Sequence, residues 1–310
     1  MQNFRSNGKI LLTGEYVVLN GAKSLALPTK MGQSLEIHKA EKNEVSLTSY
    51  DENSKVWFTS KFVINNGTFD PILNDDDQNN LEIKEISKRL QQILSAAYQQ
   101  NPRAFSEKGF KLITKMDFNR KWGLGTSSSL INNISQWLEI DPYQLLKESF
   151  GGSGYDIAAA GTNLPLTYQI TENGPATFTA DFDPPFKEDL FFVYLNRKQN
   201  SREAIAHYRN QPQGDIDSLT DKISGITEQI IQCDSLEEFK LLLKVHETLI
   251  SKAIKLPRIQ TELFPDYPGF IKSLGGWGGD FILATGGVEE KEYFRNKNYT
   301  TIFDYKDLIK

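Results

Sequence analysis

The sequence predicts an α+β protein with two lobes, and three observations support this fold class. Short β-type runs dominate the first part of the 310-residue chain. The remainder alternates strands with helices but has no regular βαβ repeat. A proline-rich stretch, FDPPF at 182–186, separates the two parts. We therefore place the domain boundary there and predict lobes at 1–185 and 186–310.

The first lobe contains predicted strands, one long helix and several turns. The strands are the runs KILLT, SLEIH, EVSLTS, KVWFTS, KFVIN, GFKLIT and LPLTYQI, and the polar segment 74–80 is expected to be a solvated loop. From Leu81 to Tyr98 apolar residues recur every three or four positions, which predicts an amphipathic helix. A glycine turn, WGLGTSSS, precedes the apolar helical run LINNISQWL. A further helix is expected at Asp141-Pro142, because the acid can cap it and proline suits its first turn.

The second lobe is predicted to begin with the strand DLFFVYL. Helices are expected near 201–208, 216–232 and 236–254, followed by a glycine-rich turn and the strand FILAT. A last helix and the strand TTIF complete the chain. This order gives the second lobe its own sheet and its own helices.

Composition and charge restrict the classes of function. The net charge of -5 argues against a general nucleic-acid surface, which needs a basic face, but it allows a small anionic substrate. No apolar stretch approaches the roughly 20 residues of a membrane span, and the first residues lack the layout of a signal peptide. We therefore expect a cytoplasmic protein with a small-molecule partner, no nucleic-acid or membrane partner, and a monomeric or homodimeric state.

The segment GLGTSSS (123–129) is the central candidate site. Its glycines allow positive φ angles and a close approach of the backbone to a ligand. The helix that follows directs free N–H groups at the turn, which is an arrangement that binds anions. The residues that could contact a phosphate are Gly123, Leu124, Gly125, Thr126, Ser127 and Ser128. A plain glycine turn with a serine cap is the alternative interpretation.

Three further segments contain candidate residues. Asp156 lies in GSGYDIAAA (152–160), where it could take a proton from a substrate hydroxyl or simply cap a helix. Lys9 stands at the start of a strand and is either functional or an ordinary surface charge. The turn GGWGGD (275–280) has four glycines in six positions, so it is either flexible or pressed against a ligand or another loop. The three histidines are scattered and are interpreted as structural.

Together these segments resemble the motifs of the GHMP kinases, a superfamily that includes galactokinase, homoserine kinase, mevalonate kinase and phosphomevalonate kinase. The first motif is similar to GKILLTGEYVVLNGAKSLALP (8–28), the second to GLGTSSS, and the third to KSLGGWGGDFILA (272–284). The resemblance implies a GHMP kinase fold with a ribosomal protein S5 domain 2-like N-terminal lobe and a ferredoxin-like C-terminal lobe. It also implies that nucleotide and substrate bind in the cleft between the lobes.

The same resemblance implies ATP and Mg²⁺ as cofactors and assigns roles by position. Asp156 would be the general base, and Lys9 would orient and polarise the substrate hydroxyl. Ser127 would contact Mg²⁺ and the phosphates, with Glu148 as a second metal ligand or, alternatively, part of a solvated helix face. Trp277 and Ser129 depart from the family, which prefers a small residue and an alanine at these positions.

Within the superfamily, Glu15-Tyr16, the GSGYDIAAA run and Gly-Gly-Asp at 278–280 resemble phosphomevalonate kinase. The expected substrate-binding residues are Glu15, Tyr16, Ser153, Gly154, Arg197, Lys198, Arg202, Gly278 and Gly279. The predicted reaction is therefore transfer of the γ-phosphate of ATP to phosphomevalonate. Mevalonate, a sugar, a related decarboxylation and a non-catalytic binding module remain alternatives.

Overall fold

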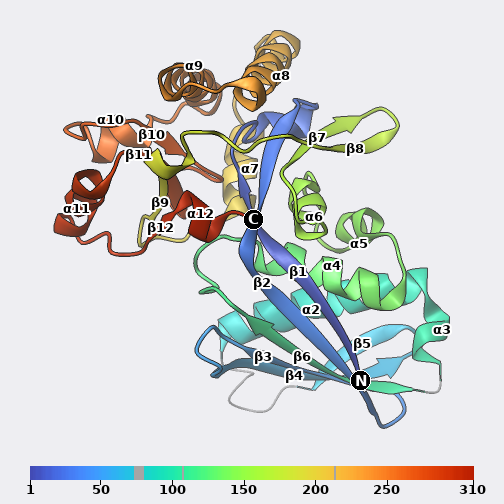
Figure 1. The fold of residues 1–310 in the computed structure, drawn as a ribbon. Helices are drawn as coiled ribbons and strands as arrows, with labels where there is room; N and C mark the ends of the chain where they lie inside the picture. The colour runs from blue at the N-terminus through green and yellow to red at the C-terminus, as the bar shows by residue number, and fades with distance from the viewer. Residues whose placement is uncertain (73–79, 107, 213) are drawn as a thin grey trace. The chain divides into compact units, whose positions relative to one another are not determined.

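The computed structural model describes residues 1–72, 80–106, 108–212 and 214–310, and these residues form two compact units (Figure 1). Unit 1 comprises 1–8, 31–120 and 125–161, and unit 2 comprises 9–30, 121–124 and 162–310. Because each unit combines several chain segments, this division differs from a single boundary after residue 185, which stays a prediction. Most of the expected polar loop at 74–80 lies outside the described residues.

The described residues of unit 1 form a sheet and five helices, and two of the strands continue into unit 2. The continuing strands are β1 (Gln2–Leu11) and β2 (Ser24–Ala40). The other strands are β3 (Glu44–Tyr50), β4 (Val56–Asn65), β5 (Thr68–Ile72) and β6 (Gly109–Met116). The helices are α2 (Leu81–Gln100), α3 (Pro102–Phe105), α4 (Thr126–Leu138), α5 (Pro142–Ser149) and α6 (Tyr155–Ala160).

The sheet of unit 1 has the strand order β5-β4-β3-β6-β2, with β1 paired to β2. Strand β3 runs parallel to β6, and the other pairs in this order are antiparallel. Apolar side chains from these strands and from α2, α4, α5 and α6 form one core. Within that core the ring of Trp137 lies edge-on to Phe105 and Phe110. The helices therefore cover one face of the sheet.

Helix α2 confirms the predicted amphipathic segment and extends it to Gln100. Asn80 caps it by accepting hydrogen bonds from the N–H groups of Glu82 and Ile83. The expected strands KVWFTS and KFVIN form one continuous strand, β4, because buried and exposed side chains alternate without interruption through most of it. Helix α5 begins at Pro142 with Asp141 as its cap, as predicted.

Unit 2 contains two groups of strands and most of the remaining helices. The strands are β7 (Leu166–Thr171), β8 (Gly174–Thr179), β9 (Leu190–Tyr194), β10 (Ile271–Ser273), β11 (Phe281–Thr285) and β12 (Ile302–Asp304). The helices are η1 (Val17–Asn20), η2 (Lys187–Asp189), α7 (Ser201–Arg209), α8 (Ile216–Gln232), α9 (Leu236–Ile254), α10 (Ile259–Leu263), α11 (Val288–Asn296) and α12 (Tyr305–Leu308).

Two apolar clusters stabilise unit 2. One lies against the antiparallel sheet β10-β11-β9-β12 and includes side chains of α10 and α11. The other joins η1 to α7, α8 and α9 and contains Tyr16, Tyr208 and Trp277. Tyr16 and Trp277 have positive φ angles of 64° and 50°, which side chains of this size rarely adopt. Burial of both rings offsets this backbone cost.

The described residues confirm the α+β class. None of the helices among them is both long enough and apolar enough to cross a lipid bilayer.

Candidate active site

The glycine loop 123–125 leads directly into α4. Gly123 and Gly125 have φ angles of 69° and 97°, so the positive φ expected from the sequence is present. Gly125 is the N-cap of α4, and no side chain caps the helix. The first backbone hydrogen bond of the helix runs from the N–H of Ser129 to the carbonyl of Gly125. The N-terminus of α4 therefore keeps the character of an anion-binding site.

The hydroxyl groups of this loop differ in their surroundings. Those of Ser128 and Ser129 both donate to the carbonyl of Gly125 at 2.9 Å. The Ser129 hydroxyl also lies 2.9 Å from Oε1 of Gln33 in the interior of unit 1, so the departure from alanine is accommodated by a buried polar contact. Thr126 and Ser127 are only half-buried. These two residues are the better candidates for contact with a ligand.

In unit 2, Lys9 lies against the first part of the glycine loop. Its backbone N–H donates to the carbonyl of Leu124 at 2.9 Å, and its Nζ donates to the carbonyl of Gly123 at 3.0 Å. The lysine is half-buried. Strand β1 and the glycine loop are joined at this point by both backbone and side chain.

Asp280 also lies against Gly123, although no role was expected for its carboxylate from the sequence. A Cβ atom at Gly123 would come within 2.3 Å of Oδ2 of Asp280, so the carboxylate packs directly against this glycine. Burial raises the pKa of Asp280, while a hydrogen bond from the N–H of Gln199 and the charges of Lys9 and Lys198 lower it. The only signal in the sequence was the acidic end of the GGWGGD turn.

The GGWGGD turn is pressed against another loop, which was one of the two alternatives for its glycines. A Cβ at Gly279 would lie 2.8 Å from the carbonyl oxygen of Arg197, and one at Gly276 would lie 2.7 Å from Cγ of Gln199. Gly278 has a positive φ of 76° and open space around its Cα. Close packing therefore requires glycine at 276 and 279, and backbone conformation favours it at 278.

Asp156 lies in the first turn of α6, within unit 1. Gly154, with a φ of 90°, is the N-cap, and Oδ1 of the half-buried Asp156 accepts a hydrogen bond from the N–H of the adjacent Ile157 at 3.1 Å. Burial raises the pKa of Tyr143, and the charges of Asp141 and Asp156 raise it further. Asp156 is thus near Tyr143 of α5, while Ser153 is half-buried and Gly154 is buried.

Glu15 belongs to a buried ionic cluster in unit 2. Its Oε1 lies 2.5 Å from Nζ of Lys272, and its Oε2 lies 3.4 Å from Nε2 of His246. The N–H of Ser273 donates to Glu247 at 2.5 Å. The four ionisable side chains are at most 1% exposed. This burial does not support direct substrate contact by Glu15, and Tyr16 is likewise buried against Tyr208.

Burial controls the ionisation of this cluster. It raises the pKa of Glu15 to about 7 even though Lys272 lowers it. It also raises the pKa of Glu247 and lowers that of His246 well below its usual value. The N–H of Gly14 donates to Nε2 of His246 at 2.9 Å, so this nitrogen carries no proton. His246 is therefore a neutral structural residue, as the sequence analysis expected.

The remaining predicted residues lie on exposed surfaces. Glu148 on α5 accepts hydrogen bonds from Gln144 at 2.7 Å and from Gln100 at 3.4 Å, which matches the solvated-face alternative better than a metal site. Arg197, Lys198 and Arg202 are exposed on the loop after β9 and the first turn of α7. Among the described residues no group of three His, Cys, Asp or Glu side chains could hold a metal ion.

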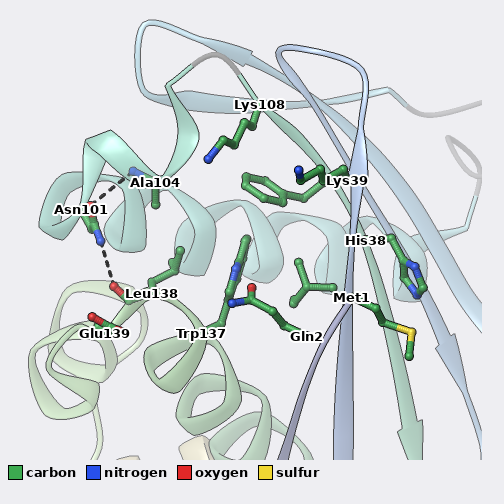
Figure 2. A pocket seen from close by; sticks show the side chains of 12 residues that line it. Met1, Gln2, His38, Lys39, Asn101, Ala104, Lys108, Trp137, Leu138 and Glu139 are labelled. Atoms are coloured by element: carbon green, nitrogen blue, oxygen red, sulfur yellow. Dashed lines mark hydrogen bonds between the residues drawn. The ribbon is translucent and has the colours of Figure 1, made fainter.

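A cavity of about 390 Å³ in unit 1 contains none of the predicted site residues (Figure 2). Ile37, Phe110, Trp137 and Leu138 provide its apolar lining. Lys39 and Lys108 are exposed residues on its rim. Its lining is separate from the glycine loop, from Asp156 and from Lys9, so it has no evident part in the candidate chemistry.

Solved structures of small-molecule kinases are similar to this chain over nearly its full length. The L. major mevalonate kinase in complex with R-mevalonate is 13% identical, with a TM-score of 0.67 over 98% of this chain and 94% of that one. The Methanococcus jannaschii mevalonate kinase is 17% identical, with a TM-score of 0.63 over 97% and 96%. The Streptococcus pneumoniae phosphomevalonate kinase, in complex with phosphomevalonate and AMPPNP, is 16% identical, with a TM-score of 0.65 over 96% of both chains.

These similarities show that the chain has the GHMP kinase fold, which confirms the fold expected from the motifs. No protein-family model matches the chain, and no curated protein matches it in sequence. At identities of 13–17% the fold is established, whereas the acceptor of the phosphoryl group is not.

Proposed function

We propose that this protein is an ATP-dependent kinase that phosphorylates a small metabolite. The observation that carries the proposal is the glycine loop 123–125, which leads into a helix without a side-chain cap in a chain with the GHMP kinase fold. Free N–H groups at a helix N-terminus, with the positive end of its dipole, suit the phosphates of a nucleotide. The similar phosphomevalonate kinase binds AMPPNP, an ATP analogue.

The proposed chemistry needs few residues. Phosphoryl transfer depends mainly on positioning and on neutralising charge. In the proposal Asp156 accepts the proton of the acceptor hydroxyl, and Lys9 orients that hydroxyl. Mg²⁺ neutralises phosphate charge when it is bound, and it usually needs only one or two protein ligands besides phosphate oxygens and water. The half-buried hydroxyl of Ser127 fits such a sparse donor set, whereas Glu148 is engaged with glutamines.

The proposed acceptor is phosphomevalonate, in the mevalonate pathway of isoprenoid synthesis. The support is the exposed cations Arg197 and Lys198, which lie on a loop packed against the GGWGGD turn, and the exposed Arg202 in the first turn of α7. Guanidinium and ammonium groups bind phosphate by charge-assisted hydrogen bonds. Mevalonate is the second candidate, because two of the similar structures are mevalonate kinases. We place the reaction in the cytoplasm.

The test is an ADP-release assay with ATP, Mg²⁺ and separate acceptors: mevalonate, phosphomevalonate and a panel of sugars. We expect phosphomevalonate to give the highest kcat/KM. A preference for mevalonate or a sugar would replace the acceptor and keep the kinase. Release of CO₂ from diphosphomevalonate would identify a decarboxylase. Nucleotide binding without ADP release from any acceptor would contradict the kinase proposal.

A further inference from the structure

Asp280 connects two chain segments of unit 2 by three hydrogen bonds. Its N–H donates to the carbonyl of Arg197 at 2.7 Å, and its carbonyl accepts from the N–H of Leu195 at 2.8 Å. Its side chain adds a third bond, because Oδ1 accepts from the N–H of Gln199 at 3.1 Å. The first two bonds involve only backbone atoms. The third bond depends on the carboxylate, and its donor, Gln199, directly follows Lys198 in the loop.

The other oxygen of this carboxylate is directed at the glycine loop. Oδ2 would lie 2.3 Å from a Cβ at Gly123, and the carbonyl of Gly123 accepts from Nζ of Lys9 at 3.0 Å. One carboxylate thus lies among the glycine loop, the proposed catalytic lysine and the cationic loop. The charges of Lys9 and Lys198 both act on Asp280.

The backbone at Asp280 also indicates a specific role for this side chain. Its φ is 53°, a left-handed conformation that glycine adopts without strain and that aspartate and asparagine tolerate better than most residues. Glycine precedes it at 278 and 279. A turn that needed only conformational freedom would be served by glycine at 280 as well. The carboxylate is instead largely buried, and this burial removes part of its hydration.

We infer that Asp280 is a positioning residue for the proposed kinase reaction, holding Lys9 by its charge and residues 197–199 by its hydrogen bond to Gln199. This inference rests on the proposed function for its kinetic consequences, but its structural part does not. Asp280 is not assigned contact with the substrate. It acts through Lys9 at the hydroxyl to be phosphorylated and through the loop that presents Arg197 and Lys198 to an anionic acceptor.

The two parts of this role can be separated by substitution. Asp280→Asn keeps an oxygen acceptor for Gln199 and tolerates the positive φ, but it removes the charge near Lys9. Asp280→Ala removes both the charge and the acceptor. If Asp280→Ala does not fold, Asp280→Gly also lacks the carboxylate and suits the backbone. Asp266→Ala, at an exposed aspartate of the same unit, is the matched control.

Hydrogen exchange without substrate tests the structural part. We expect the amide of Gln199 to exchange about tenfold faster in Asp280→Ala or Asp280→Gly and at a rate near wild type in Asp280→Asn, because only the Asn variant keeps the acceptor. The amide of Leu195 bonds to the backbone carbonyl of Asp280 and is the internal reference. Equal exchange at Gln199 in all variants would overturn the inference even if the protein is not a kinase.

Steady-state kinetics tests the functional part. We expect Asp280→Asn to lower kcat about tenfold with acceptor KM nearly unchanged, since Lys9 loses its counter-charge. Asp280→Ala should show the same loss of kcat and, in addition, about a tenfold higher acceptor KM, because the cationic loop is released. The positioning role would be overturned if both variants kept the kinetic constants of the wild type. It would also be overturned if their main effect were a raised Mg²⁺ requirement. If the wild-type protein itself shows no activity with any acceptor, the proposed function is contradicted instead.

Discussion

Asp156 and Glu15 are both carboxylates within motif-like segments, yet their surroundings differ in every respect that matters for chemistry. Asp156 is half-buried in the first turn of a short helix, after a glycine N-cap. Glu15 is 1% exposed and contacts Lys272 inside a closed cluster. The comparison teaches that a carboxylate in a glycine-rich motif is not thereby a functional group. Access to a ligand distinguishes the proposed catalytic residue from the structural one.

The largest effect is expected at Asp156. Asp156→Asn keeps the shape of the side chain but removes the proton acceptor, so kcat should fall by roughly 10²–10⁴-fold if this residue is the general base. Nucleotide affinity by titration calorimetry and the free energy of unfolding should change little. Asp141→Asn is the matched control, since its side chain caps α5 and asparagine caps equally well. A normal kcat for Asp156→Asn would remove Asp156 from the mechanism.

The next effect concerns stability and comes from the Glu15 cluster. Lys272→Met leaves Glu15 and Glu247 buried without their cation, so we expect the free energy of unfolding to fall by about 3–5 kcal/mol. Urea denaturation measures this change. Lys187→Met, at an exposed ion pair with Asp183, should cost less than about 1 kcal/mol. Equal losses in the two variants would show that the buried cluster has no special role in stability.

A smaller effect is the dependence of stability on pH. Because the pKa of Glu15 is raised to about 7, the folded state binds this proton more tightly than the unfolded state does. Glu15 therefore stabilises the fold at low pH, and this contribution is lost as the pH rises through 7. The lowered pKa of His246 acts in the opposite direction, since stability falls as the pH drops below its unfolded value near 6.5.

The two groups partly cancel in the wild-type protein, and a single variant separates them. In Glu15→Gln the contribution of Glu15 is removed, while those of His246 and of Glu247, whose pKa is also raised, remain. Stability should therefore rise more steeply between about pH 5 and 6.5 than in the wild type. The expected difference in slope is on the order of 1 kcal/mol per pH unit. Denaturant titrations at a series of pH values provide the measurement. Parallel pH profiles for the two proteins would show that Glu15 keeps an ordinary pKa in the folded state.

The smallest effect is expected at a third carboxylate, Glu148. Its side chain is exposed and accepts hydrogen bonds from Gln100 and Gln144. Glu148→Gln should therefore leave kcat and the Mg²⁺ requirement within about twofold of wild type, and stability within about 0.5 kcal/mol. An increased Mg²⁺ requirement measured by activity titration would restore the metal-ligand role that the family resemblance implied.

Much of the architecture could be predicted from the sequence because its signals are local. The periodicity of 81–98 and the Asp-Pro pair at 141–142 gave helices that the structure confirms. By contrast, β2 extends over Ser24–Ala40, whereas only its segment SLEIH was expected. Pro28 and Gly32 interrupt the apparent pattern, and tertiary pairing with β6 and β7 overrides that local signal.

The candidate site was predictable only in part for the same reason. The glycine loop has local requirements, and its positive φ angles follow from them. The burial of Glu15 depends on Lys272 and His246, more than 200 positions away in the chain. The importance of Asp280 likewise depends on Gly123 and Gln199, which come from other segments. Such partners cannot be identified by reading one segment.

The positive φ of Trp277 has a consequence for how this chain can evolve. Replacement by glycine would relieve the backbone but leave a void in the cluster with Tyr16 and Tyr208, at a cost of several kcal/mol. Replacement by a smaller non-glycine residue would keep the strain and lose the packing as well. An exchange between tryptophan and a small residue at this position is therefore expected to need compensating changes in the packed residues beside η1 or in α7. Single substitutions at position 277 are therefore expected to be destabilising unless the residues packed against it change as well.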